Sequence, residues 1–269
     1  MLGKLVKNEL KSYRFSMGIV FLAGFIFTIF MKIICMLPYQ YEIREVIQVL
    51  GFYGYYYLIM LVGAAAQVLV VIRFYSTMVG DRGYLTWTLP AKSSTILWSK
   101  IIGGSLWEIL AAVVTYVYLA IFFVGNYWVD NFIDDELTWM LKDMLDAFQP
   151  RYMVTVILVV AAILLWSIVP LLLIYLCIAI GQLFGKWRIL ASIGCYFILM
   201  ILLQIVLVVG IVLVAGAAVA VSPGQYMADL SGFAFLNGLF AVLDVIGIAG
   251  FAALFAITNF IFKKHLNLE

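Results

Sequence analysis

Long uninterrupted apolar runs constrain this chain more than any other feature of its sequence. The six runs lie at about residues 16–37, 51–72, 98–125, 153–180, 189–221 and 236–262. Each reaches about 20 residues, the length at which a helix crosses the core of a bilayer. The runs do not alternate between apolar and polar residues, which excludes the strands of a membrane barrel. Because 67% of the residues are hydrophobic and only 11% are charged, we predict an all-α, polytopic membrane protein with a single transmembrane domain over residues 1–269.

The distribution of charge predicts the orientation of these spans. If both termini are cytoplasmic, the inner segments hold 12 of the 16 Lys and Arg residues. Nine of the 14 Asp and Glu residues then lie in the outer segments. Inner loops of membrane proteins carry an excess of Lys and Arg. We therefore expect both termini on the cytoplasmic side.

The N-terminal segment, residues 1–15, is expected to form a helix that lies in the inner interface of the membrane. Its cations fall at helical spacing on one face: Lys4, Lys7, Lys11 and Arg14. The opposite face is mainly apolar: Leu2, Leu5, Val6, Leu10 and Tyr13. Such a helix can direct its cations toward anionic membrane lipids. The alternative is an ordinary basic leader that only sets the topology.

Two further segments interrupt the pattern on the predicted outer side. Residues 126–151 combine an apolar stripe with acidic residues, which indicates an amphipathic helix on the outer leaflet or over the spans. No calcium-binding loop motif occurs among the acids, so a solvated acidic face is favoured. The fifth run is too long for one simple span, and Pro223 and Gly224 predict that its helix breaks near Ser222.

No catalytic, metal-binding or nucleotide-binding motif is evident. The three cysteines include no CxxC pair, and the chain has one histidine, which argues against a metal site. The stretch GQLFGKWR, Gly181–Arg188, differs from a phosphate-binding loop because three residues rather than four separate its glycines. Trp187 also occupies the place of the magnesium-binding hydroxyl, and no strand precedes the stretch. We expect no enzyme activity, no cofactor of this chain's own and no nucleic-acid partner.

Polar residues within the spans are candidates for a transport path or an ion pair. Lys32 and Asp244 are both expected about 24–27 Å above the inner boundary, so they could pair, or each could extend separately to the outer interface. Glu108 is expected about 12 Å into the third span. It could be protonated, bind Gln67 or Gln204, or face a path, because charged groups in lipid are costly.

The segment 73–97 is the largest predicted cytoplasmic feature. The stretch RFYSTMVGDRGYLTWTLPAKSSTILWSK, from Arg73 to Lys100, holds four cations, one acid and several aromatic and hydroxyl side chains. A loop that only set the topology could be shorter and less aromatic. We therefore expect that this segment contacts a soluble partner.

This stretch resembles the segment after the second span in ABC-2 type permeases of Gram-positive bacteria. The matching residues are Phe74–Tyr75, Gly80–Tyr84, Thr88–Pro90 and Ser99–Lys100. Arg82 stands where the family more often has an acid. The family's architecture, with an N-terminal elbow helix, six spans and both termini inside, also agrees with the pattern read above.

The resemblance implies that the segment forms a coupling helix that docks on a separate cytoplasmic ABC ATPase, which holds ATP and Mg. The residues expected to serve this contact are Arg73, Phe74, Tyr75, Asp81, Arg82, Gly83, Tyr84, Thr88 and Pro90. The aromatic side chains would be anchors and the arginines would supply complementary charge. Pro90 would end the element, and Ser93 or Ser94 would cap the next helix.

The expected function is therefore that of a permease subunit in a bacterial plasma membrane. It would export a peptide, lipid-like or drug-like substrate, as in antimicrobial peptide resistance. Six spans are half of the usual twelve, so an identical or different second permease chain is expected. One alternative is a sensor or immunity protein that binds a toxic peptide without pumping. Another is a secondary transporter driven through Glu108, although the required inverted repeats are not evident.

Overall fold

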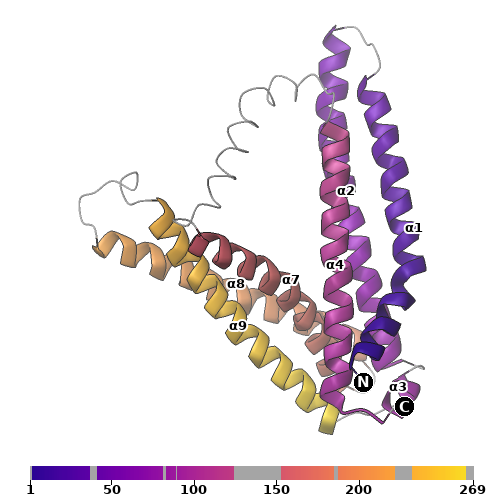
Figure 1. Ribbon diagram of the computed structural model, residues 1–269, viewed down its shortest axis with the longest axis vertical. Coiled ribbons are helices and arrows are strands. Elements are labelled where there is room, and N and C mark those ends of the chain that lie inside the picture. The colour runs from indigo at the N-terminus through magenta and orange to yellow at the C-terminus, as the bar shows by residue number, and fades with distance from the viewer. Residues whose placement is uncertain are drawn as a thin grey trace. The chain divides into compact units, whose positions relative to one another are not determined.

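The computed structural model describes residues 2–36, 41–80, 83–88, 90–123, 153–184, 187–221 and 232–264. The predicted outer helix at 126–151, the predicted break near Ser222, and the side chains of Asp81 and Arg82 lie outside these residues. In the described part, the chain forms helices and no strand (Figure 1). The helices are α1 (Leu2–Met36), α2 (Tyr41–Met78), α3 (Gly83–Trp87), α4 (Ser93–Phe123), α7 (Met153–Gly181), α8 (Arg188–Val221) and α9 (Gly232–Lys264).

Six of the described helices are long and apolar enough to cross a membrane. They are α1, α2, α4, α7, α8 and α9, and each contains most or all of one predicted span. The exception among the described helices is α3, which has five residues. The prediction of an all-helical, multi-pass membrane protein is therefore confirmed.

The chain divides into two compact units with three of these long helices each. Unit 1 comprises Met1–Thr77 and Trp98–Leu141, and contains α1 and nearly all of α2 and α4. Unit 2 comprises Met78–Leu97 and Lys142–Glu269, and contains α3, α7, α8 and α9.

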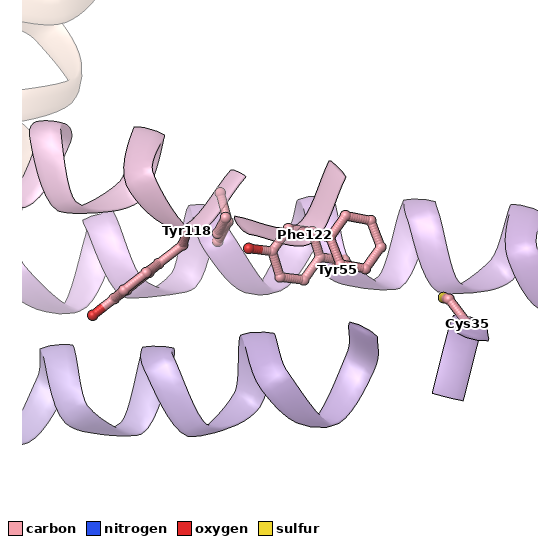
Figure 2. Packing of buried hydrophobic residues seen from close by; sticks show 5 residues of the cluster. Cys35, Tyr55, Tyr118 and Phe122 are labelled. Atoms are coloured by element: carbon pink, nitrogen blue, oxygen red, sulfur yellow. The ribbon is translucent and has the colours of Figure 1, made fainter. Parts of the chain in front are cut away.

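Aromatic and small residues bring the three helices of unit 1 together. Tyr55 on α2 stacks on Phe122 of α4 with 3.9 Å between the ring centroids, and Tyr118 and Cys35 belong to the same buried cluster (Figure 2). A methyl group added at Gly24 of α1 would lie 3.0 Å from the Tyr118 ring and 3.1 Å from Val62. A larger residue at Gly24 would therefore press on both neighbours, and the glycine favours this close approach of α1 to α2 and α4.

Unit 2 is built around the second half of α7. This half contains a nearly continuous series of buried residues, Val169, Leu171–Leu173, Tyr175–Ala179 and Gly181. Helix α7 packs on both α8 and α9, which also contact each other (Figure 1). Gly210 of α8 lies close to Ile246 of α9, and Gly247 of α9 lies close to Leu165 of α7.

A tight turn joins α7 to α8. The amide of Phe184 donates to the carbonyl of Gly181 at 3.2 Å, and α8 begins at Arg188. A methyl group at Gly181 would lie 2.7 Å from the carbonyl oxygen of Arg188 and would also collide with the Ser192 hydroxyl. Gly181 thus permits the end of α7 to lie against the start of α8.

Candidate functional site

The connection between α2 and α4 contains a short helix of its own. Helix α2 ends at Met78, and a turn follows in which the amide of Gly83 donates to the carbonyl of Gly80 at 2.7 Å. Helix α3 then continues to Trp87, and the amide of Thr88 donates to the carbonyl of Tyr84 at 3.1 Å. We refer to residues 79–92 as the α2–α4 connection.

Side chains of unit 2 hold the α2–α4 connection in place. The indole Nε1 of Trp87 donates to the carbonyl of Met78 at 3.1 Å, where the end of α2 lacks helical hydrogen-bond donors. The Trp87 ring also packs on Phe262 of α9, with 5.8 Å between centroids. At the far end, the Ser93 hydroxyl donates to the amide oxygen of Asn259 at 3.2 Å. The α2–α4 connection is therefore held at Trp87, the last residue of α3, and at Ser93, the first residue of α4.

Lys92 occupies the cap position that was expected of Ser93 or Ser94. Its carbonyl accepts the amide of Ile96 at 3.2 Å and the amide of Thr95 at 2.9 Å, as the residue before the first helical turn does. The predicted serine cap is therefore wrong for Ser93, whose hydroxyl binds Asn259 instead. The Ser93 hydroxyl forms a hydrogen bond to α9 instead of capping the start of α4.

Helix α3 presents an exposed aromatic and aliphatic pair. Tyr84 and Leu85 are each 67% exposed, while Gly83 is buried. Thr88 and Pro90, which were also expected in the partner contact, are exposed. Leu85 was not among the residues expected in the partner contact. We refer to Tyr84 and Leu85 as the α3 pair.

The two other aromatic residues expected to contact a partner lie within α2. Phe74 is fully buried and Tyr75 is half-buried. Packing against the rest of the chain thus occupies Phe74, which leaves Tyr84 as the most accessible of the three aromatic candidates. The adjacent Arg73 points toward α1, in the cluster described next.

A buried ionic cluster joins α1, α2 and α4 of unit 1. Lys100 of α4 is 3% exposed, and its amino group donates to the carboxylate of Glu9 on α1. The same amino group donates to the Thr77 hydroxyl of α2 at 2.8 Å. The Thr77 hydroxyl in turn donates to the carbonyl of Arg73 at 2.8 Å. This chain of bonds satisfies a lysine that would otherwise be a costly buried charge.

Arg73 completes the cluster from α2. Its Nε lies 4.0 Å from Oε2 of Glu9, and its guanidinium lies 5.3 Å from the centroid of the Tyr13 ring. One carboxylate therefore faces two cations, and the aromatic ring supplies a further favourable contact for the arginine. We refer to Glu9, Tyr13, Arg73, Thr77 and Lys100 as the ionic cluster.

This cluster was not predicted from the sequence. Arg73 and Lys100 were expected only as parts of the stretch between the second and third spans, and Glu9 was not a candidate. One signal was available: Glu9 is the only acid before Glu42, and it lies on the face opposite to the cations of the N-terminal segment. An acid on the less polar face of an amphipathic helix indicates a buried partner.

The first residues of α1 have the two faces that the sequence predicts. Lys4, Lys7, Lys11 and Arg14 are all exposed, while Leu5, Val6 and Leu10 are half-buried and Tyr13 is buried. These residues belong to the same continuous helix as the first span, because α1 runs from Leu2 to Met36. The position of this segment in the membrane interface stays a prediction.

Lys32 has a partner within unit 1. Its amino group donates to the carbonyl of Ile121 at 2.9 Å, close to the end of α4 at Phe123. A lysine near the C-terminal end of a helix interacts favourably with the negative end of the helix dipole. Asp244 of unit 2 is buried, and neither of its carboxylate oxygens has a hydrogen-bond partner within the described residues. The Lys32–Asp244 ion pair stays a prediction.

The remaining polar candidates are not joined in the described structure. Glu108 is partly buried on α4, and its Oε1 has no hydrogen-bond partner among the described residues. Gln67 is half-buried on α2 in the same unit, and no hydrogen bond links it to Glu108 in the described part. Gln204 is exposed on α8, in unit 2.

Comparisons of the chain with protein-family models, with characterised proteins and with solved structures found no match. The functional argument therefore rests on the α3 pair, the ionic cluster and the six long apolar helices.

Proposed function

We propose that this chain is the permease subunit of an ABC exporter of the ABC-2 type, and that helix α3 is its coupling helix. The observation that supports the proposal is the α3 pair, on a short helix anchored between two membrane-spanning helices. An exposed tyrosine beside an exposed leucine supplies rigid apolar area for a soluble partner. The partner is a separate cytoplasmic ABC ATPase that holds ATP and Mg.

The proposed orientation places both termini and helix α3 in the cytoplasm of a bacterial cell. The cationic face of the first residues of α1 then meets the anionic lipids of the inner leaflet. A second permease chain, identical or different, completes the usual twelve spans. The substrate is a peptide, lipid-like or drug-like molecule, and this chain hydrolyses nothing.

The proposed mechanism transmits a movement of the ATPase to the membrane helices. ATP binding closes the two ATPase subunits and displaces the α3 helices of the two permease chains toward each other. Because α3 is joined to α2 and α4 through short connections, these spans tilt and an outward path opens. Rigid-body movements of this kind are a common form of conformational switching.

Co-purification tests the proposal. The tagged wild-type chain is extracted from its own membranes in mild detergent, and bound proteins are identified by mass spectrometry. We expect an ABC ATPase with the wild type and at least a tenfold smaller amount with the Tyr84→Ala/Leu85→Ala variant, because that variant removes the central apolar anchors. The bound protein must hydrolyse ATP with sensitivity to vanadate.

A matched control separates loss of contact from loss of folding. Tyr116 on α4 is 71% exposed and lies within a predicted span, so Tyr116→Ala removes an exposed tyrosine away from α3. It should retain the ATPase. If the wild type binds no ABC ATPase in any mild detergent, the exporter proposal is wrong, and the sensor or immunity function becomes the better candidate.

A further inference from the structure

The ionic cluster includes residues of α2, which precedes the α2–α4 connection, and a residue of α4, which follows it. Arg73 lies five residues before Met78, the last residue of α2, and Lys100 lies seven residues after Ser93, the first residue of α4. Glu9 contacts both of these cations from α1. A single carboxylate of the N-terminal segment therefore links the helix that enters the connection to the helix that leaves it.

The packing around Glu9 is close enough to fix the position of α1. A methyl group at Gly103 of α4 would lie 3.1 Å from the Cβ of Glu9. The backbone of α4 therefore lies close to α1 at this point. Tyr13 lies one turn further along α1, under the Arg73 guanidinium and 6.4 Å from the Trp107 ring of α4. The same face of α1 thus contacts α2 and α4 at successive turns.

Glu9 differs from the other charged residues of its segment in being largely buried. The four cations of the N-terminal segment are exposed, whereas the Glu9 side chain is 12% exposed and the Lys100 side chain is 3% exposed. Removing one partner of a buried ion pair leaves an uncompensated charge, which is strongly destabilising. Exposed charges contribute little by comparison.

We propose that Glu9 is a positioning residue that locks α1 to α2 and α4, so that these three helices move as one body when a partner displaces α3. The lock itself follows from the ionic cluster. Its role in transmission rests on the proposed function, in which the partner is an ABC ATPase.

Hydrogen exchange measures the lock without any partner. The full-length chain is placed in lipid nanodiscs, and amide exchange is followed for residues 6–13 in the wild type and in Glu9→Gln. We expect exchange to become about tenfold faster or more in the variant, because the segment loses its buried anchor and opens locally. Lys11→Gln changes an exposed charge of the same segment and should exchange like the wild type.

A charge swap distinguishes the ion pair from a simple requirement for glutamate. The double variant Glu9→Lys/Lys100→Glu restores a carboxylate and an ammonium group between α1 and α4. Because Arg73 would then face an ammonium group instead of a carboxylate, the double variant should recover part, but not all, of the slow exchange in residues 6–13. Exchange as slow in Glu9→Gln as in the wild type, or as fast in the double variant as in Glu9→Gln, would overturn the lock.

ATP hydrolysis measures transmission in the same variants. With the co-purified ATPase, Glu9→Gln should bind as much ATPase as the wild type, because the α3 pair is unchanged. The part of the hydrolysis rate that depends on the permease should fall, because helices that no longer move as one body transmit less of the displacement of α3, and the charge swap should restore part of it.

Hydrogen exchange and ATP hydrolysis test different parts of the proposal. An unchanged hydrolysis rate in a Glu9→Gln variant with fast exchange would show that the lock transmits nothing, and would overturn that part of the proposal. Absence of any ATPase from the wild type would instead disprove the exporter function. The exchange experiment would then still decide whether Glu9 positions α1.

Discussion

At the scale of single residues, charged side chains deep in the chain serve helix ends and helix contacts. Lys32 binds a carbonyl near the end of α4, and Lys100 binds a carboxylate and a hydroxyl. Both satisfy the rule that a cation in an apolar environment requires acceptors. The two lysines thus have different structural roles, and their positions along the predicted spans do not distinguish these roles.

A double-mutant cycle decides between the helix-end contact of Lys32 and its predicted pair with Asp244. We expect Lys32→Met to lower the stability of the purified chain by about 1 kcal/mol, because a charge-assisted hydrogen bond to Ile121 is lost. The effect should be the same in an Asp244→Asn background, within about 0.5 kcal/mol. Thermal unfolding in detergent measures it, and a clearly smaller effect in that background would indicate that the two residues are coupled.

At the scale of elements, glycines determine where helices can approach each other. The turn from α7 to α8 depends on Gly181, whose absent side chain makes room for the carbonyl of Arg188 and for Ser192. By contrast, nothing lies within 4 Å of a methyl group built at Gly194 on α8. Two glycines in neighbouring helices therefore differ in what a substitution would do.

We expect Gly181→Ala to destabilise unit 2 by about 1–3 kcal/mol, the usual cost of forcing extra volume into a packed contact. Gly194→Ala should be neutral or slightly stabilising, because alanine favours helix more than glycine does. The yield of monodisperse protein after heating in detergent compares the two. Equal loss from both variants would contradict the role assigned to Gly181.

At the scale of the whole molecule, six crossings by the long apolar helices would return the chain to its starting side, so we expect both termini on the same side of a membrane. The excess of Lys and Arg in the predicted inner segments predicts that this side is the cytoplasm. The positions of helix α3 and of the first residues of α1 relative to the membrane both follow from this orientation.

Reporter fusions test the orientation. A fluorescent protein that matures only in the cytoplasm should be fluorescent when it is fused to Glu269. A periplasmic phosphatase fused at the same residue should be inactive, and it should become active when fused after residue 125, at the predicted outer end of the third span. The opposite result would place α3 outside the cell and exclude a cytoplasmic ATPase as its partner.

Much of this architecture could be predicted from sequence because the membrane restricts the choices. In a bilayer core, backbone groups must be satisfied within the segment, so a continuous apolar run of sufficient length becomes a helix. This is why the described spans coincide with the predicted runs.

The partners of polar side chains could not be predicted, because they come from helices far apart in the chain. The sequence by itself determined the helical class, the number of spans and the amphipathic faces of the N-terminal segment, since each depends on local periodicity. Only the tertiary structure decided that Glu9 meets Lys100 and Arg73, that Ser93 binds Asn259 rather than capping α4, and that Phe74 is buried while Leu85 is exposed. Those outcomes depend on which helices pack together, and packing is a property of the folded chain rather than of any one segment.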